Sequence, residues 1–255
     1  MTSAGSASSD QSFKDHFSGH SGSYAEYRPT YPDDLFTFLT DCCVERRLAW
    51  DCATGNGQAA RALAPHFERV IATDASEAQI RAARSDPKID FRVAKAEQSG
   101  LDDDSTDLIT VAQALHWFDI NRFFDEVQRV LVPGGVLAVW SYQTCLVNAD
   151  CDAIIHEIYV DIVGEYWPPE REIVDGGYQS IELPMPSIAV PPIAMKVDWT
   201  ADDMLGYLRT WSASQRYTKD KGADPVSIIE SRLNHAWGGG RREVSWPLNI
   251  KIGRA

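Results

Sequence analysis

Short apolar runs alternate with amphipathic segments along the middle of the chain. The runs have the length of buried strands, and between them apolar residues recur with the spacing of one helical face. One such face is formed by Phe123, Phe124, Val127, Val130 and Leu131. We expect this helix to end at residues 133–135, Pro-Gly-Gly. We expect strands at residues 47–53, 69–74, 89–93, 107–111 and 136–140.

Strands separated by helices favour a parallel sheet that is covered on both faces, because parallel neighbours need a crossover connection that is usually helical. The predicted fold class is therefore α/β, with an open, doubly wound sheet. Ligands in such sheets bind at the carboxyl ends of the strands, near the point where the strand order switches. Candidate chemistry is therefore sought in the loops after the first four strands.

The second half of the chain follows a different pattern. Apolar residues recur at helical spacing over 151–166, and then Pro184, Pro186, Pro191 and Pro192 interrupt regular structure, which predicts an inserted cap. Regular structure resumes at 194–199, with helices from Thr200 towards Tyr217 and over 224–237, and a last strand around 244–252. We expect a single domain over 1–255, composed of a disordered tail (1–12), an N-terminal arm with helices (13–46), a ligand-binding core (47–142), a cap insertion (143–200) and C-terminal helices with the last strand (201–255).

Composition and charge narrow the class of protein. The 255 residues include 37 Asp and Glu against 24 Lys and Arg, a formal net charge of −13, and 44% are hydrophobic, as in an ordinary globular enzyme. The negative field repels phosphate backbones and anionic lipids, so we expect neither a nucleic-acid nor a membrane partner. Five cysteines without a C-x-x-C pair predict neither a disulfide framework nor a zinc site. With no signal-peptide pattern at the start we expect a cytoplasmic location, and the oligomeric state stays open.

The main candidate motif is the turn at residues 51–57, Asp-Cys-Ala-Thr-Gly-Asn-Gly, between the first strand and the next helix. Gly55 and Gly57 permit a close ligand approach that a Cβ atom would block. Asp74 ends the second strand, where a carboxylate can accept hydrogen bonds from both hydroxyls of a ribose. Together these features predict a nucleoside-containing ligand.

Residues 55–60 also fit the dinucleotide pattern G-x-G-x-x-G/A, although a lone match of that kind is weak evidence. Asp51 lies ahead of the glycines, where a carboxylate suits an ammonium group or a bound water better than a pyrophosphate. The Ala96-Glu97 pair follows the third strand and is positioned to flank an adenine. Residues 113–117, Gln-Ala-Leu-His-Trp, place polar and aromatic groups where a reacting group would lie.

With these residues the sequence resembles the class I S-adenosylmethionine-dependent methyltransferases, in the type 11 group, over about residues 13–142. It is similar to the branch of trans-aconitate methyltransferases and related small-molecule enzymes through residues 24–32, 115–119 and 207–212. The resemblance implies a Rossmann-like, mostly parallel seven-stranded sheet with an antiparallel last strand and an inserted cap. It also implies S-adenosylmethionine as cofactor and in-line methyl transfer to a small-molecule acceptor, with a carboxylic acid as one candidate.

The resemblance further implies which residues contact the cofactor. The methionine part would lie against the 51–57 turn, the ribose on Asp74, the adenine beside Ala75 and the Ala96-Glu97 pair, and Gln113 beneath the cofactor. The implied contacts are, in chain order, Tyr24, Arg28, Asp51, Ala53, Gly55, Gly57, Asp74, Ala75, Ala96, Glu97 and Gln113. The family commonly has Gly where this chain has Ala53, which leaves the seating of the methionine end open.

The acceptor pocket is expected beyond the fourth strand. His116 is the candidate general base, because an unperturbed histidine titrates near neutrality. A carboxylate acceptor would need no base, and no metal is expected. Candidate substrate contacts are Trp117, Trp140, Tyr142, Arg209 and Trp211.

Two other function classes stay open at this point. The glycine pattern permits an NAD-dependent oxidoreductase, and the Ala53 departure permits a non-catalytic methyltransferase-like binding module. Individual residues also have structural alternatives: Glu97 as an exposed loop acid, His116 packed beside Trp117, and each tryptophan as an ordinary core residue.

Overall fold

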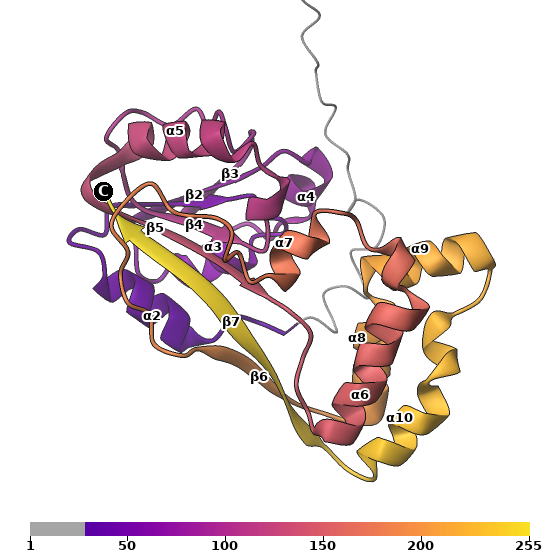
Figure 1. Cartoon of the computed structure of the whole chain (residues 1–255). Helices are drawn as coiled ribbons and strands as arrows, with labels where there is room; N and C mark the ends of the chain where they lie inside the picture. Colours follow the sequence, from indigo (N-terminus) through magenta and orange to yellow (C-terminus); the bar gives the residue numbers. More distant parts are fainter. Residues whose placement is uncertain (1–28) are drawn as a thin grey trace, which may run out of the picture.

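The computed structural model describes residues 29–255, and its centre is one seven-stranded sheet (Figure 1). The strand order is β3-β2-β1-β4-β5-β7-β6. The strands are β1 (Leu48–Cys52), β2 (Arg69–Asp74), β3 (Ile89–Val93), β4 (Thr106–Ala112), β5 (Leu131–Tyr142), β6 (Ala194–Trp199) and β7 (Arg242–Arg254). The strand order switches at β1. The chain continues from β1 to β2 and β3 on one side of it, and β4 lies on the other side.

Strands β1 to β5 are parallel to one another, whereas β7 pairs antiparallel with both β5 and β6. The central strands are almost wholly buried, as expected for parallel strands covered on both faces. The predicted fold class is therefore confirmed, including the mostly parallel seven-stranded sheet and the antiparallel last strand.

Helices cover both faces of the sheet, and alternate residues of each strand supply the two cores. On one face Ala49, Val70 and Leu108 pack with helices α2 (Asp33–Asp41) and α3 (Gln58–Leu63). On the other face Trp50 and Ile109 pack with α5 (Ile120–Val130). Helix α4 (Glu77–Ala82) follows β2, and its N-cap Ser76 accepts a hydrogen bond from the backbone N–H of Gln79.

A separate helical layer lies beyond the end of the sheet (Figure 1). It is built from α6 (Ala149–Glu157), η2 (Ile158–Ile162), η3 (Gly164–Tyr166), α8 (Ala201–Arg209), α9 (Ser212–Lys221), η4 (Pro225–Ile228) and α10 (Glu230–Trp237). These helices share one core with residues of β6 and β7. The short helix α7 (Arg171–Asp175) lies between this layer and the sheet (Figure 1).

Three predicted elements differ from the structure. The helix expected over 151–166 is α6 followed by a π turn, η2, and the 3-10 helix η3. The helix expected to run from Thr200 towards Tyr217 is broken between α8 and α9, because Trp211 adopts an extended conformation that buries its indole ring in the helical core. We expected the α5 helix to end at residues 133–135, but it already ends at Val130. Strand β5 begins at Leu131 and includes residues 133–135, with a register shift opposite Thr106.

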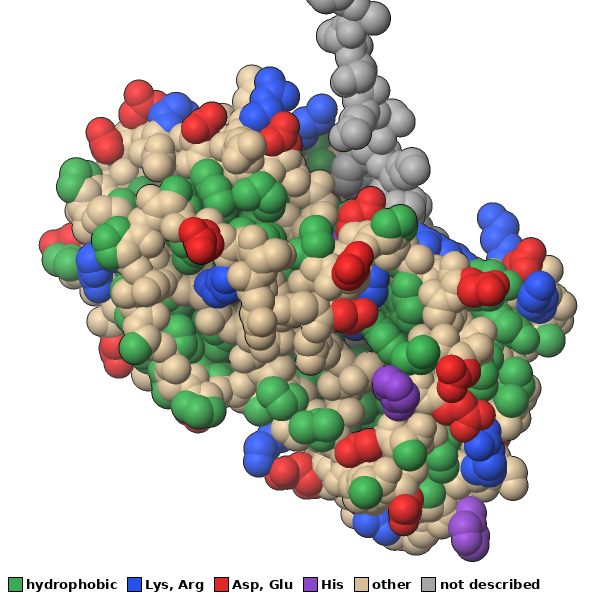
Figure 2. Space-filling view, viewed as in Figure 1, with side chains coloured by type: hydrophobic (Ala, Val, Ile, Leu, Met, Phe, Trp, Pro, Cys, Tyr) green, Lys and Arg blue, Asp and Glu red, His purple; other side chains and the backbone are tan. Residues whose placement is uncertain are grey.

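Charged side chains are mixed on the face shown in Figure 2, where Lys and Arg alternate with Asp and Glu among the described residues. All five cysteines are free. Within residues 29–255, no helix is long and apolar enough to cross a membrane.

Candidate active site at the carboxyl edge of the sheet

The turn after β1 has three residues with positive φ. Gly55 and Gly57 have φ of 58° and 85°, and Ala53 has φ of 53°, a region that costs an L-residue about 1–2 kcal/mol. At Gly57 an added Cβ would lie 2.7 Å from the Phe91 ring, so this glycine is required by packing as well as by its dihedral angle. The turn therefore retains its shape despite a methyl group at position 53, where a glycine would be unstrained.

Asp51 holds this turn from below. Its carboxylate is fully buried and accepts hydrogen bonds from Thr54 Oγ1 at 2.5 Å, Ala60 N at 3.0 Å and Thr110 Oγ1 at 2.8 Å. These bonds connect β1, the turn, the first turn of α3 and β4. Burial raises the pKa of Asp51 to about 6 despite them. The structure thus gives Asp51 a supporting position under the turn.

Asp74 lies at the end of β2, beside the same turn. Its Oδ2 accepts a hydrogen bond from Gly55 N at 2.9 Å, and its Oδ1 accepts one from Ser76 N at 2.8 Å. Both bonds orient the carboxylate at the carboxyl edge of the sheet. Ala75 follows it and is partly exposed.

Ala96 and Glu97 follow β3 on the same edge. Ala96 is buried, and Glu97 is half-buried with its Oε1 accepting a hydrogen bond from Asp119 N at 2.9 Å. This bond connects the loop after β3 to the N-terminus of α5. One oxygen of Glu97 therefore has a structural partner, and its Oε2 has no hydrogen-bond partner among the described residues.

Gln113 ends β4 in a conformation that is unusual for a side-chain-bearing residue. Its φ is 54°, and its Nε2 donates to Tyr142 O at 2.9 Å. Its Oε1 is buried and finds no hydrogen-bond partner among the described residues. A strained backbone together with an unsatisfied buried acceptor is a combination that clusters at ligand sites.

His116 lies in the short helix η1 (Leu115–Trp117), directly after Gln113. Its Nδ1 lies 2.9 Å from the hydroxyl oxygen of Tyr178, which is fully buried and has φ of 58°. Burial, with a smaller effect of the Arg171 charge, lowers the pKa of His116 to about 4. His116 is therefore neutral at physiological pH.

A cluster of aromatic and charged side chains lies where α7 meets the helical layer. The guanidinium carbon of Arg171 is 5.3 Å from the ring centre of Tyr159 and 4.8 Å from that of Trp167. Arg171 Nε donates to Tyr159 Oη at 2.7 Å and to Asp175 Oδ1 at 3.0 Å, and the Tyr159 hydroxyl donates to Asp175. Trp211 packs against both rings, with centroids 5.6 and 5.7 Å away.

The predicted substrate residues do not all meet at one place. Trp117 packs beside His116 with ring centroids 4.6 Å apart, and Tyr142 is buried at the edge of the helical core. Trp140 points to the opposite face of the sheet and packs edge-on against Tyr31 and Phe36. Tyr24 and Arg28 lie outside the described residues.

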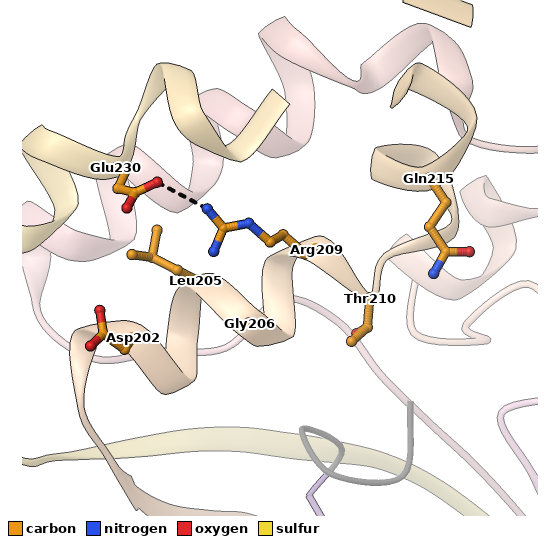
Figure 3. A pocket seen from close by; sticks show the side chains of 7 residues that line it. All are labelled: Asp202, Leu205, Gly206, Arg209, Thr210, Gln215 and Glu230. Atoms are coloured by element: carbon orange, nitrogen blue, oxygen red, sulfur yellow. Dashed lines mark hydrogen bonds and ion pairs between the residues drawn. The ribbon is translucent and has the colours of Figure 1, made fainter. Parts of the chain in front are cut away.

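Arg209 lies on α8, with its side chain directed at Glu230 of α10 (Figure 3). It lines an open hollow of about 500 Å³ and forms ion pairs with Asp224 at 2.8 Å and Glu230 at 2.9 Å. Two carboxylates therefore already pair with its guanidinium group, and no contact between Arg209 and His116 is present among the described residues.

Comparisons with known proteins agree with this geometry. A family model described as a methyltransferase domain matches residues 50–139. A protein of Dictyostelium discoideum named as a methyltransferase is 36% identical over 229 residues, which cover 88% of this chain and 87% of that protein. A solved structure from Anaeromyxobacter dehalogenans, described as a type II methyltransferase, is 42% identical with a TM-score of 0.84, covering 89% of this chain and 97% of that one. The chain belongs to the class I S-adenosylmethionine-dependent methyltransferases.

This assignment confirms the predicted family, enzyme class and cofactor. A protein of Saccharomyces cerevisiae named as an S-adenosylmethionine-dependent methyltransferase is also similar, at 32% identity over 131 residues, or 48% of this chain and 45% of that protein. Among the open alternatives, the matches favour the methyltransferase over the NAD-dependent oxidoreductase. The trans-aconitate branch stays a prediction.

The residues at the carboxyl edge fit the methyltransferase cofactor. Asp74 places an acceptor carboxylate at this edge, the buried Gln113 Oε1 has no hydrogen-bond donor among the described residues, and the turn at Gly55 has a positive φ. The sequence did not predict that Tyr178 and Arg171 lie near His116. Tyr178 has no sequence signal, because a single tyrosine after a helix is unremarkable in any pattern, and Arg171 has only its i, i+4 spacing to Asp175.

Proposed function

We propose that this methyltransferase transfers a methyl group to a small organic acid, bound between the loop after β4 and the helical layer. The observation that carries the proposal is the setting of Arg171. Its side chain is only 21% exposed, and aromatic rings lie within cation–π distance of the guanidinium group. A half-buried cation at this junction favours an anionic acceptor.

Arg171 is held ready to bind a carboxylate. Its Nε is used by Tyr159 and Asp175, which fixes the plane of the guanidinium group. Its terminal Nη1 and Nη2 have no hydrogen-bond partner among the described residues. Paired terminal N–H groups match the two oxygens of a carboxylate, and Arg is suited to this bidentate geometry in a way that Lys is not.

The cofactor would be held by the turn at Ala53, Gly55 and Gly57, with Asp74 on the ribose and Gln113 beneath it. When bound, S-adenosylmethionine supplies a methyl group on a positively charged sulfur, and a nucleophile takes this group in line with the departing thioether. A carboxylate oxygen is already ionised, so no side chain has to remove a proton. The protein's part is then alignment and exclusion of water, and alignment alone is worth roughly 7–11 kcal/mol in well-oriented reactions.

The function is tested by incubating the full chain with methyl-labelled cofactor and separate pools of small carboxylic acids, phenols, amines, peptides and tRNA. We expect label in the acid pool. Label confined to peptide or RNA would contradict the proposal, and binding of S-adenosylhomocysteine without transfer to any pool would favour the non-catalytic module.

The acid-binding role of Arg171 is tested by Arg171→Lys, which retains the charge and removes the planar fork. We expect the KM for the acid to rise about tenfold to a hundredfold, while the affinity for S-adenosylhomocysteine changes little. Arg232→Lys is the matched control, because Arg232 pairs with Glu157 at 2.7 Å on the outer surface. An increase in KM with Arg209→Lys but not with Arg171→Lys would place the acceptor in the outer hollow instead.

A further inference from the structure

We propose that the Tyr159 hydroxyl keeps Asp175 from pairing with the terminal nitrogens of Arg171, so that these nitrogens stay free for the carboxylate of the acceptor. Tyr159 is then a positioning residue, since it acts on the acceptor through Arg171. The inference rests on the proposed function for the role of Arg171, but the state of the guanidinium group can be measured without any acceptor.

Asp175 is the competitor for this guanidinium group. It lies four residues after Arg171 on α7, a spacing at which oppositely charged side chains meet on a helix. A carboxylate so placed can accept two parallel hydrogen bonds from a guanidinium group, and such bidentate pairs are stronger than single contacts. Gln143 Nε2 donates to the backbone oxygen of Asp175, which holds this end of α7 against the end of β5. An acid acceptor therefore has to bind beside a carboxylate that could occupy the same nitrogens.

The Tyr159 hydroxyl lies between the two charged side chains. Arg171 Nε donates to Tyr159 Oη at 2.7 Å, and this hydroxyl in turn lies 2.6 Å from Asp175 Oδ1 and 2.8 Å from Asp175 Oδ2. The direct contact between Arg171 and Asp175 uses Nε, at 3.0 Å from Oδ1. Neither terminal nitrogen of Arg171 has a hydrogen-bond partner among the described residues. The hydroxyl thus occupies Oδ2, the oxygen that a terminal nitrogen of Arg171 would need for a bidentate pair.

Tyr159 is held in this place by its backbone and by its ring. Val163 N donates to Ile158 O at 3.0 Å, which is the hydrogen bond of a π turn. Tyr159 O instead accepts from Trp167 Nε1 at 3.1 Å. The Tyr159 ring packs edge-on against Trp211, with the two ring planes at 89°. Single π turns often occur at functional sites, and this one carries the residue whose hydroxyl separates the two charges.

Removing the hydroxyl should therefore close the acid-binding position. In Tyr159→Phe, Asp175 Oδ2 loses its donor, and a terminal nitrogen of Arg171 can take its place. The paired guanidinium group then offers fewer N–H groups and less net charge to an anionic acceptor. Adding Asp175→Asn to the same chain removes the competing charge and should free the guanidinium group again. A residue that only supported the fold would not be rescued by this second substitution.

The state of the guanidinium group is measured by labelling the full chain with phenylglyoxal, which modifies the terminal nitrogens of arginine. The rate of modification at Arg171 is followed by mass spectrometry. We expect Tyr159→Phe to slow this rate about tenfold, and Tyr159→Phe/Asp175→Asn to return it to within about threefold of the wild type. An unchanged rate at Arg171 in Tyr159→Phe would overturn the inference.

Two controls come from the same helical layer. Arg232 is an internal reference for a bidentate pair, because its Nη1 and Nη2 both donate to Glu157 at 2.7 Å. Its rate of modification should be the same in every variant. Tyr166→Phe is the matched variant, since it also removes a tyrosine hydroxyl that donates to an aspartate, Asp220, at 2.7 Å. It should leave the rate at Arg171 as in the wild type.

Asp175→Asn in the otherwise unchanged chain tests the inference even if Tyr159→Phe does not fold. Because the hydroxyl already keeps Asp175 from the terminal nitrogens, we expect this substitution to change the rate of modification at Arg171 by less than about threefold. An increase of about tenfold or more would show that Asp175 occupies these nitrogens in the wild type, and would overturn the inference.

The KM for the acid extends the same test to the reaction. We expect Tyr159→Phe to raise this KM about tenfold and the added Asp175→Asn to lower it again, with the affinity for S-adenosylhomocysteine measured alongside to separate acceptor binding from general damage. A KM in the double variant at or above that of Tyr159→Phe would overturn the inference, because Asp175 would then not be a competitor. The expected labelling combined with no transfer to any acid would support the role of Tyr159 and contradict the proposed function alone.

Discussion

Replacing Asp51 with Asn tests the account of the turn after β1, because Asn retains the shape of the side chain and removes its charge. The Asn oxygen can accept from Ala60 N and Thr54 Oγ1, and the amide can donate to Thr110 Oγ1. In the wild type, burial raises the pKa of Asp51 from 3.8 to about 6. A difference of this size corresponds to about 3 kcal/mol of destabilisation once the carboxylate is ionised.

The direction in which pH changes the stability contribution of Asp51 follows from the number of protons that the folded and unfolded chains bind. Between pH 3.8 and about 6 the folded protein retains a proton on Asp51 that the unfolded chain has lost, so the contribution of Asp51 to stability falls as pH rises. Below this window the carboxyl group is protonated in both states and the penalty vanishes. We therefore expect Asp51→Asn to gain about 2–3 kcal/mol of stability relative to the wild type between pH 4 and pH 7.

The free energy of unfolding of the variant must be compared with that of the wild type at each pH, because the titration of His116 changes the stability of both proteins in the opposite direction. Its pKa is lowered from 6.5 to about 4, so the unfolded chain binds the extra proton and stability rises with pH across that range. The assay is urea unfolding at a series of pH values, followed by fluorescence. Asp125→Asn, a substitution of an exposed acid on α5, is the control for removing a negative charge. A pH-independent difference for Asp51→Asn would refute the burial argument.

Two further predictions concern stability alone. Ala53→Gly relieves a positive φ that costs about 1–2 kcal/mol, but it removes a partly packed methyl group and adds about 0.4–1 kcal/mol of conformational entropy to the unfolded chain. We therefore expect the free energy of unfolding, measured in urea, to change by less than about 1 kcal/mol. A larger loss of stability would show that position 53 is unstrained. Glu126→Ala leaves the buried Ser99 N–H without its partner at 2.7 Å, and we expect a loss of about 2–3 kcal/mol with unchanged acceptor KM. A neutral result for Glu126→Ala would mean that the loop after β3 does not depend on this bond.

Much of the fold could be predicted from the sequence because parallel strands are buried on both faces. The second and third strands have the predicted bounds, because a short apolar run of this kind is typical of a buried strand. The helical layer was harder to predict, because its breaks depend on tertiary packing. Trp211 interrupts a continuous helical pattern only because its indole ring is buried among Tyr159, Trp167 and Tyr207.

The candidate site divides in the same way. Residues at strand ends, such as Asp74 and Gln113, could be placed from the sequence because parallel strands bring their carboxyl ends to one edge. Arg171 and Tyr178 could not, since they come from a loop-rich segment and meet His116 only through the packing of α7 against η1. Arg209, one of the candidate substrate contacts from the sequence, forms ion pairs with Asp224 and Glu230 in the structure.

The most direct test of the central claim is calorimetric titration of S-adenosylhomocysteine into the wild type and Asp74→Ala. The account places the cofactor ribose on Asp74, so we expect the wild type to bind and the variant to lose at least about a hundredfold in affinity, since two hydrogen bonds to a charged group are removed. Asp125→Ala should bind as the wild type does. Unchanged affinity in Asp74→Ala would contradict the placement of the cofactor at the carboxyl edge of β1 and β2.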